Sequence, residues 1–234
     1  MGNVEKFKVL ALFSGGKDST LSVWEILKMG YRVVSLLTVK PLNPESWMFH
    51  YPCINLTPLQ SEAMQIPLYT VTTKGEKEKE IEDLKNALKK LKSKLGFEAI
   101  VSGVVESKYQ KSRIEKVCEE VGLVSLTPLW HKKPEKLLEE IIANGFNVVF
   151  TAVAAEGLTE KWLNRKLDWK AVEELKMLNK KFKIHLTFEG GEAETFVKDT
   201  PFFKKRIEFL DVEKIWRKDS GYLLVRKAVL LSKG

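Results

Sequence analysis

The amino-acid sequence predicts an α/β fold, with a parallel sheet flanked by helices and a smaller C-terminal α+β domain. Apolar runs of strand length alternate with amphipathic helical patterns through the first half of the 234 residues, as they do in a parallel sheet. Near the C-terminus two strand-like runs follow each other without an intervening helix, which is typical of antiparallel pairing. We therefore expect two domains, residues 1–125 and residues 126–234.

In the first domain, strands and helices succeed one another in regular order. Strand-like runs cover residues 7–13, 31–39, 66–72 and 99–101, and helical patterns cover 21–27, 76–95 and 114–121. Gly30, Gly96 and Gly122 follow the helical patterns as stop signals. Residues 40–56 contain three prolines, which indicate a long functional loop.

In the second domain the pattern is looser. One helix is expected over 137–142, after Pro134, and a second over 170–181. Strands are expected over 147–154, 206–216 and 222–231.

Composition limits the kinds of partner and site. Lysine and arginine exceed aspartate and glutamate by 39 to 31, and the net charge of +8 favours an anionic partner. No apolar run approaches the ~20 residues of a membrane span and no targeting pattern is visible, so we expect a cytoplasmic protein. Cys53 and Cys118 are far apart, and the three histidines lack metal-ligand spacing, which argues against a disulfide framework or a zinc module.

A glycine-rich loop joins the first strand-like run to the first helical pattern. It consists of Ser14, Gly15, Gly16, Lys17, Asp18 and Ser19. Backbone N–H groups and the helix dipole favour an anion at such a junction, and paired glycines let the main chain approach phosphate oxygens. A tight turn before an acidic first helical turn would also explain the glycines and Asp18, but the whole hexapeptide favours phosphate binding. A carboxylate beside phosphate is repelled unless a cation bridges them, so we infer Mg²⁺ near Asp18.

Residues 102–113 form a second polar group, again between a strand-like run and a helix. Ser107 and Gln110 have the spacing of a capping box, so local helix architecture explains them as well as a functional role does. Arg113, one turn into the helix, is placed to reach a nucleotide or an acidic side chain.

A third group places Glu189, Glu192 and Glu194 within six residues of an otherwise basic chain. Two glycines among them indicate a turn, and surface glutamates are ordinarily only solvated. In an extended segment Glu192 and Glu194 point to the same side, where their like charges need Mg²⁺, ammonium or a cationic substrate.

The tryptophans leave two interpretations open. Residues such as Trp162 and Trp169 belong more often to a core than to a ligand cage, and Asp168 is placed to cap the following helix. Indole faces beside carboxylates would, however, also bind a quaternary ammonium group.

The hexapeptide at 14–19 resembles the pyrophosphate loop of the N-type ATP pyrophosphatases, whose fold is Rossmann-like and of the adenine nucleotide alpha hydrolase type. With further segments in the same order, the chain resembles the diphthine–ammonia ligases, also called diphthamide synthases, in their short archaeal form. Those segments are Met48–His50, Ser107–Arg113, Pro128–Trp130, Gly157–Asp168 and Glu189–Thr195. Lys108, Lys111 and Ala193 depart from residues that are frequent in the family.

The resemblance implies ATP-dependent amidation of diphthine on elongation factor 2, through an acyl-adenylate, giving diphthamide, AMP and pyrophosphate. No glutaminase signature is visible around Cys53 or Cys118, so we expect free ammonia as the nitrogen donor. The resemblance also implies ATP and Mg²⁺ as cofactors, with no direct nucleic-acid or membrane partner. The hexapeptide and Gly103 would bind ATP, with Asp18 holding the metal. Lys17, Asp18 and the three glutamates would be catalytic, and the glutamates would recognise the trimethylammonium group of diphthine. Substrate binding would involve Tyr109, Gln110, Arg113, Trp162, Asp168, Gly190, Gly191 and Thr195.

Two other functions stay open on the sequence. The first is an adenylating enzyme of the same superfamily that modifies transfer RNA, which the net charge would suit. A sulfur-transferring member would need a thiol pair, for which Cys53 and Cys118 give weak support. The second is a non-catalytic nucleotide-binding sensor built on the same fold.

Overall fold

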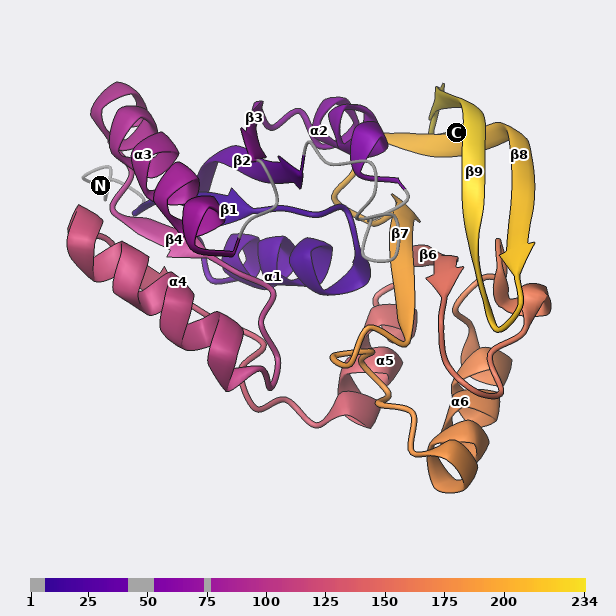
Figure 1. Ribbon diagram of the computed structural model, residues 1–234. Helices are drawn as coiled ribbons and strands as arrows, with labels where there is room; N and C mark the ends of the chain where they lie inside the picture. The colour runs from indigo at the N-terminus through magenta and orange to yellow at the C-terminus, as the bar shows by residue number, and fades with distance from the viewer. Residues whose placement is uncertain (1–6, 42–52, 74–76) are drawn as a thin grey trace. The chain divides into compact units, whose positions relative to one another are not determined.

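The computed structural model describes residues 7–41, 53–73 and 77–234, and the chain divides into two compact units (Figure 1). The first contains the described residues of Met1–Ser14, Asp18–Met48 and Ile66–Trp130. The second contains those of Gly15–Lys17, Phe49–Gln65 and His131–Gly234. Two short segments that precede the predicted boundary near residue 125 therefore group with the C-terminal part of the chain.

The first unit is built on a five-stranded parallel sheet. Its strands are β1 (Lys8–Leu12), β2 (Arg32–Pro41), β3 (Leu68–Thr73), β4 (Ala99–Val101) and β5 (Val124–Leu126), and they are arranged in the order β3-β2-β1-β4-β5. The helices are α1 (Lys17–Lys28), α3 (Lys77–Leu95) and α4 (Lys108–Val121). Because β1 lies in the middle of this sheet, its carboxyl end opens at a central position, where α/β proteins bind their ligands.

One apolar cluster fixes α3 and α4 on this sheet. Leu84, Leu88 and Leu91 of α3 pack against Leu10 of β1 and Ile100 of β4. Figure 1 shows α3 and α4 side by side in the magenta part of the chain. The leucine spacing at i, i+4 and i+7 that predicted the helix thus forms its buried face.

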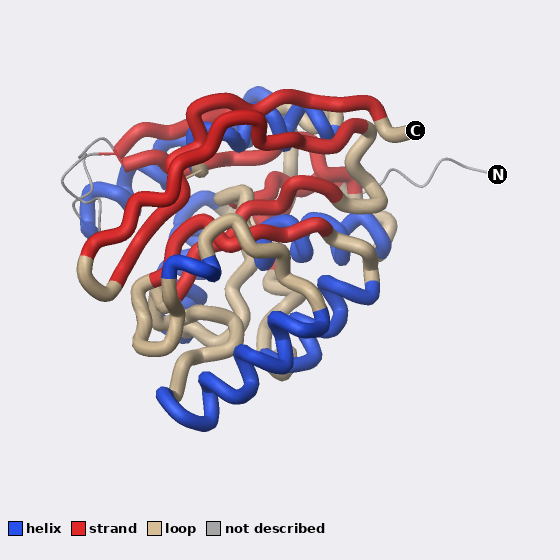
Figure 2. Tube along the Cα trace, turned by 90° about the vertical axis from the view of Figure 1, so that its right-hand side faces the viewer, coloured by secondary structure: helices blue, strands red, loops and turns tan. Residues whose placement is uncertain are grey.

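The second unit holds a four-stranded antiparallel sheet. Its strands are β6 (Asn147–Val153), β7 (Ala193–Asp199), β8 (Lys205–Arg217) and β9 (Ser220–Ser232), arranged in the order β7-β6-β9-β8. The helices are α2 (Thr57–Met64), α5 (Pro134–Ala143) and α6 (Trp169–Phe182), with short 3₁₀ turns η2 (Ile54–Leu56) and η3 (Glu160–Trp162). In Figure 2 the β8–β9 hairpin is seen lengthwise, and β9 leads to the C-terminus. The two sheets confirm the predicted fold class.

The sequence did not predict α2. Its buried face consists of Thr57, Gln60, Ala63 and Met64, so half of that face is polar and gives no apolar periodicity. Across the described residues, no helix is both long enough and apolar enough to cross a membrane.

Candidate functional site

The glycine-rich loop begins at the carboxyl end of β1, which neighbouring β2 holds in place. The Phe13 N–H donates to the Leu37 carbonyl oxygen at 2.9 Å, and the Thr38 hydroxyl donates to the Phe13 carbonyl oxygen at 2.7 Å. Both contacts hold Phe13, the last residue before the loop, against β2. The position at which the loop begins, Ser14, is therefore fixed by the parallel sheet.

Two hydroxyl groups lie together where α1 begins. The Oγ atoms of Ser14 and Ser19 are 3.2 Å apart, and the Ser14 N–H donates to the Ser19 hydroxyl at 3.4 Å. Asp18 lies in the first turn of α1, whose N-terminal N–H groups carry partial positive charge. Hydroxyl donors, helix N–H groups and one carboxylate thus share this turn.

Gly103, which follows β4, packs directly against the main chain of that turn. A Cβ atom on Gly103 would lie 2.7 Å from the Asp18 carbonyl carbon and 2.7 Å from the Ser19 nitrogen. Backbone atoms cannot move aside cheaply, so only glycine fits. The structure therefore brings together two sequence segments that were predicted to bind one nucleotide.

The remaining loop residues, Gly15 to Lys17, are attached to β7 and α2 within the second unit. The Gly15 carbonyl oxygen accepts hydrogen bonds from the Val197 N–H at 3.0 Å and from Gln60 Nε2 at 2.9 Å. The Lys17 N–H donates to the Thr195 hydroxyl at 3.1 Å, which satisfies one of the N–H groups that a helix start leaves open. Thr195 therefore supports the loop.

The Lys17 side chain is buried, with 2% of its surface exposed. Its Nζ donates to the Thr187 carbonyl oxygen at 2.8 Å and lies 4.8 Å from the centre of the Phe188 ring. From the sequence, Lys17 is expected to carry a charge that reaches phosphate. In the structure this ammonium group is held by the segment that leads into the glutamate-rich turn.

Glu192 holds its own turn together. One carboxylate oxygen accepts from the His185 N–H at 2.8 Å and the other from the Gly190 N–H at 2.9 Å. Strand β7 starts only at Ala193, so Glu192 precedes it, whereas Glu194 lies in the strand, in register with Ala152. The sequence predicts that the like charges of Glu192 and Glu194 need a cation beside them. In the structure, two backbone N–H groups donate to the Glu192 carboxylate instead. Gly191, with φ +82°, allows the turn.

Trp162 and Asp168 take the structural roles that the sequence left open. Trp162 is 4% exposed, its ring meets Phe150 edge to face at 5.0 Å, and the Arg165 guanidinium lies 4.3 Å from its centre. The Asp168 carboxylate accepts from the Ala171 N–H at 2.8 Å and caps α6. These contacts favour packing and capping over a ligand cage at both positions.

The start of α4 combines a helix cap with an exposed aromatic residue. The Ser107 hydroxyl accepts from the Gln110 N–H at 3.3 Å, so the capping interpretation accounts for this pair. Tyr109 is 56% exposed, and the Arg113 guanidinium lies 4.4 Å from the centre of its ring. A planar cation over an exposed ring is a surface suited to an acidic or anionic group.

Metal ligands and thiols add little to the site. Among the described residues, no group of three or more histidines, cysteines, aspartates or glutamates is arranged to hold a metal ion. The segment Met48–His50, one of those that resemble the family, lies outside the described residues.

Burial raises the pKa of Cys53 to about 12 and that of Cys118 to about 11, so both thiols stay protonated and unreactive near neutral pH.

Comparison with known proteins identifies the family. The diphthamide synthase N-terminal domain matches residues 7–125, and the diphthamide synthase C-terminal domain matches residues 133–231. This chain belongs to the diphthamide synthase family. The resemblance drawn from the loop and the glutamate-rich turn is thereby confirmed, together with the expected enzyme class, a ligase.

Curated relatives carry the name diphthine–ammonia ligase. The protein from Schizosaccharomyces pombe is 38% identical over an alignment 241 residues long. This alignment covers 95% of this chain but only 39% of that protein. Those from Bos taurus and Homo sapiens are 36% identical over 219 residues, which cover 86% of this chain and 82% of each relative. A solved structure described as a predicted subunit of tRNA methyltransferase from Methanocaldococcus jannaschii aligns over 83% of this chain, with 18% identity and a TM-score of 0.42, too low to carry an argument.

Gln60, Thr187 and Phe188 contact the loop, yet the sequence analysis did not assign them a role. Gln60 is an isolated amide on a helix without apolar periodicity. Lys17 meets Thr187 through a backbone carbonyl, which every residue type carries, so no sequence signal marks it.

Proposed function

We propose that this chain catalyses ATP-dependent amidation of the diphthine carboxylate on elongation factor 2, in the cytoplasm, with free ammonia as the nitrogen donor. The observation that carries the proposal is the match of both diphthamide synthase domains along almost the whole described chain. The name shared by the curated relatives indicates the two substrates. The loop at 14–19 indicates how ATP takes part.

The loop fits the phosphates of ATP. A Cβ on Gly15 would lie 2.4 Å from Gln60 Oε1, and one on Gly103 would strike the backbone of Asp18, so the packing of the loop requires glycine at both positions. The Ser14 and Ser19 hydroxyls and the first N–H groups of α1 supply donors beside them. A polyphosphate is the ligand that such a donor set suits.

Asp18 fits a metal that arrives with the nucleotide. Mg²⁺ bound to ATP needs only one or two protein carboxylates, and Asp18 lies in the same helical turn as the serine hydroxyls. When bound there, Mg²⁺ would offset the negative charge of the phosphates.

The proposed chemistry proceeds in two steps. A carboxylate oxygen of diphthine attacks the α-phosphorus of ATP, the bond to the β-phosphate oxygen breaks, and pyrophosphate leaves. Ammonia then attacks the acyl carbon, loses a proton, and AMP departs with the former carboxylate oxygen. The hydroxyls and helix N–H groups stabilise the charge that develops on pyrophosphate. Lys17 links the loop to the turn before Glu189, so it positions the segment that we propose for substrate recognition.

The glutamate-rich segment supplies negative charge for the trimethylammonium group of diphthine. We assign this role to Glu189 and Glu194, while Glu192 shapes the turn through its two backbone contacts. Trp169 is 53% exposed at the first position of α6, so its indole face remains accessible to such a group. Tyr109 and Arg113 offer a second surface, suited to acidic groups of the protein substrate.

Mass spectrometry tests the proposal directly. Elongation factor 2 that carries diphthine is incubated with this protein, ATP and ammonium, and the modified residue should change from carboxylate to carboxamide. Reactions without ATP, or with glutamine in place of ammonium, should leave it unchanged. A carboxamide formed without ATP, or no carboxamide under any condition, would contradict the proposal.

The cysteines separate this function from sulfur transfer to RNA. With pKa values of about 12 and about 11, Cys53 and Cys118 should resist alkylation by iodoacetamide near neutral pH and react only after denaturation. Peptide mapping of the labelled protein checks this. Rapid labelling of either thiol in the native protein would favour the sulfur-transferring alternative.

A further inference from the structure

Gln60 lies in the second turn of α2 and is completely buried. Its Nε2 donates two hydrogen bonds, to the Gly15 carbonyl oxygen at 2.9 Å and to the Val197 carbonyl oxygen at 2.8 Å. The Val197 N–H donates to the same Gly15 oxygen. One amide group thus joins the phosphate loop to strand β7.

The chemistry of this contact calls for a carboxamide. Two carbonyl oxygens face the end of the side chain, so that end must provide two N–H donors in a small space. Glutamine provides them without charge, whereas a carboxylate offers only acceptors, and an aliphatic chain offers nothing. Replacing Gln60 would leave the Val197 carbonyl without this donor in a buried position, where an unsatisfied group costs about 1–3 kcal/mol.

The other atom of the amide explains why residue 15 is glycine. Gln60 Oε1 is buried and has no hydrogen-bond partner among the described residues. It would lie 2.4 Å from a Cβ atom on Gly15, and the Thr57 methyl group would lie 3.2 Å from the same atom. The oxygen therefore faces a Cα–H group of Gly15, an arrangement of the weak Cα–H···O kind. Gln60 and Thr57, one turn apart on α2, form the surface on which Gly15 rests.

We propose that Gln60 is a positioning residue for ATP, which fixes Gly15 so that the loop presents its N–H groups to the phosphates. The inference rests on the proposed function of that loop. It adds helix α2, which contacts Gly15 through Gln60, to the elements that hold the loop. A buried amide is an expensive way to fill space, since an apolar residue of the same volume needs no partners. A buried amide beside Gly15 is explained if the loop conformation depends on it.

The substitution Gln60→Glu tests the proposal, because its effect depends on pH. At about pH 9 the introduced carboxylate opposes two carbonyl oxygens, and ATP should bind roughly 10-fold or more weakly than in the wild type. At about pH 6 the carboxyl group, whose pKa burial raises, is protonated and donates one hydrogen bond again, so part of the affinity should return. A purely structural role would not produce recovery of ATP affinity at the lower pH.

Gln65→Glu is the matched control, since Gln65 is exposed at the end of the same helix. ATP binding is measured by isothermal titration calorimetry at both pH values, and thermal unfolding is recorded for each variant. In turnover assays, the KM for ATP should rise in Gln60→Glu while the KM for ammonium stays that of the wild type.

The outcomes separate the two proposals. If the wild type does not bind ATP, the proposed function of the loop fails. If the wild type binds ATP and Gln60→Glu binds it equally well at both pH values, the role of Gln60 is refuted. Should Gln60→Glu fail to fold, Gln60→Met keeps the volume and removes both donors, and wild-type ATP affinity in that variant would refute the role.

Discussion

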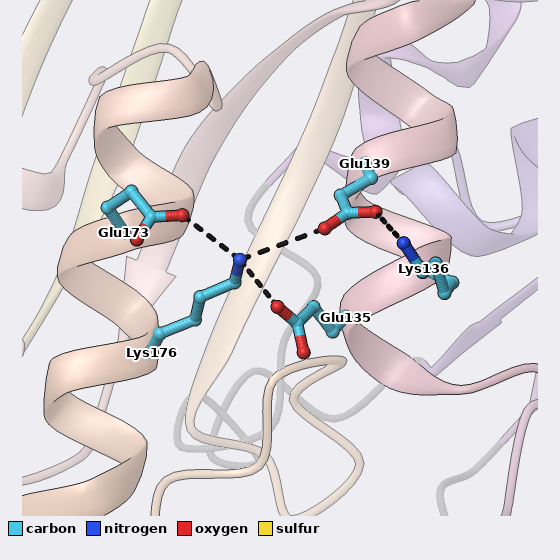
Figure 3. A network of polar contacts seen from close by, with 5 residues as sticks. All are labelled: Glu135, Lys136, Glu139, Glu173 and Lys176. Atoms are coloured by element: carbon cyan, nitrogen blue, oxygen red, sulfur yellow. Dashed lines mark hydrogen bonds and ion pairs between the residues drawn. The ribbon is translucent and has the colours of Figure 1, made fainter.

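Lys17 and Lys176 both donate hydrogen bonds to oxygen atoms, but the two ammonium groups differ in burial. Lys17 is 2% exposed and donates to the neutral carbonyl oxygen of Thr187. Lys176, on α6, lies 2.5 Å from a carboxylate oxygen of Glu135, 3.0 Å from Glu173 and 3.7 Å from Glu139. Figure 3 shows these carboxylates converging on the Lys176 ammonium from α5 and α6.

We expect the buried Lys17 to matter for activity and the hydrated Lys176 to matter little for it. Removing an ammonium group from water costs several kcal/mol. Burying a lysine is therefore a costly way to stabilise a fold. The Lys176 network stays hydrated, so each of its pairs contributes little. Four substitutions test this contrast.

The largest effect is expected for Lys17→Met, which keeps the aliphatic volume and removes the charge. We expect the rate of AMP formation to fall about 100-fold or more, because Lys17 positions the segment that we propose for substrate recognition. Thermal stability should change far less than the rate does, because the aliphatic volume is kept. Steady-state kinetics and differential scanning calorimetry measure both quantities. Wild-type turnover together with a large loss of stability would reverse the roles assigned to the two lysines.

Gly15→Ala should have the next largest effect. Its φ of +83° is strained for alanine, and the new methyl group would collide with Gln60 Oε1 at 2.4 Å. We expect ATP affinity to fall roughly 10- to 100-fold, since each such strain costs of order 1–3 kcal/mol. Gly30→Ala is the control, because Gly30 has φ +85° and nothing within 4 Å of its added Cβ. Equal loss of ATP affinity in both variants would show that the contact with Gln60 is immaterial.

Lys176→Met should lower the unfolding temperature slightly and leave AMP formation unchanged. The hydrogen bonds that Lys176 donates to Glu135 and Glu173 raise the pKa of Lys176 above its usual value, so the cation is favoured in the folded protein at neutral pH. Because these charges are hydrated, salt screens them, and the difference from wild type should shrink as sodium chloride is added. A difference that is independent of salt would mean that packing, not charge, holds Lys176 in place.

The smallest effect is expected for Lys136→Met, and it should appear only as a pH dependence. The hydrogen bond from Lys136 holds the pKa of Glu139 below its usual value. A lowered pKa stabilises the fold above that value, and the gain is lost as the pH falls through the pKa of the folded state. Denaturant unfolding from neutral to acid pH should therefore show a slightly shallower decline in the variant. Identical pH profiles of the two proteins would show that Lys136 does not lower the pKa of Glu139.

Sequence patterns predicted the fold and the glycine-rich junction between the first strand and the first helix, because both depend on local signals. The leucines of α3 and the strand–glycine–helix junction at 14–19 are such signals. Gln60 was not predictable, since its partners are backbone carbonyls 45 and 137 residues away in sequence. Glu192 was read as a site for a cation because the pattern of charges does not show which backbone N–H groups a turn will aim at a carboxylate.

Phosphorus NMR of the complete reaction tests the central claim most directly. With ATP, ammonium and elongation factor 2 carrying diphthine, we expect AMP and pyrophosphate to appear together, in equal amounts with the new carboxamide. ADP and inorganic phosphate in their place would show cleavage between the outer phosphates, and would contradict attack at the α-phosphorus.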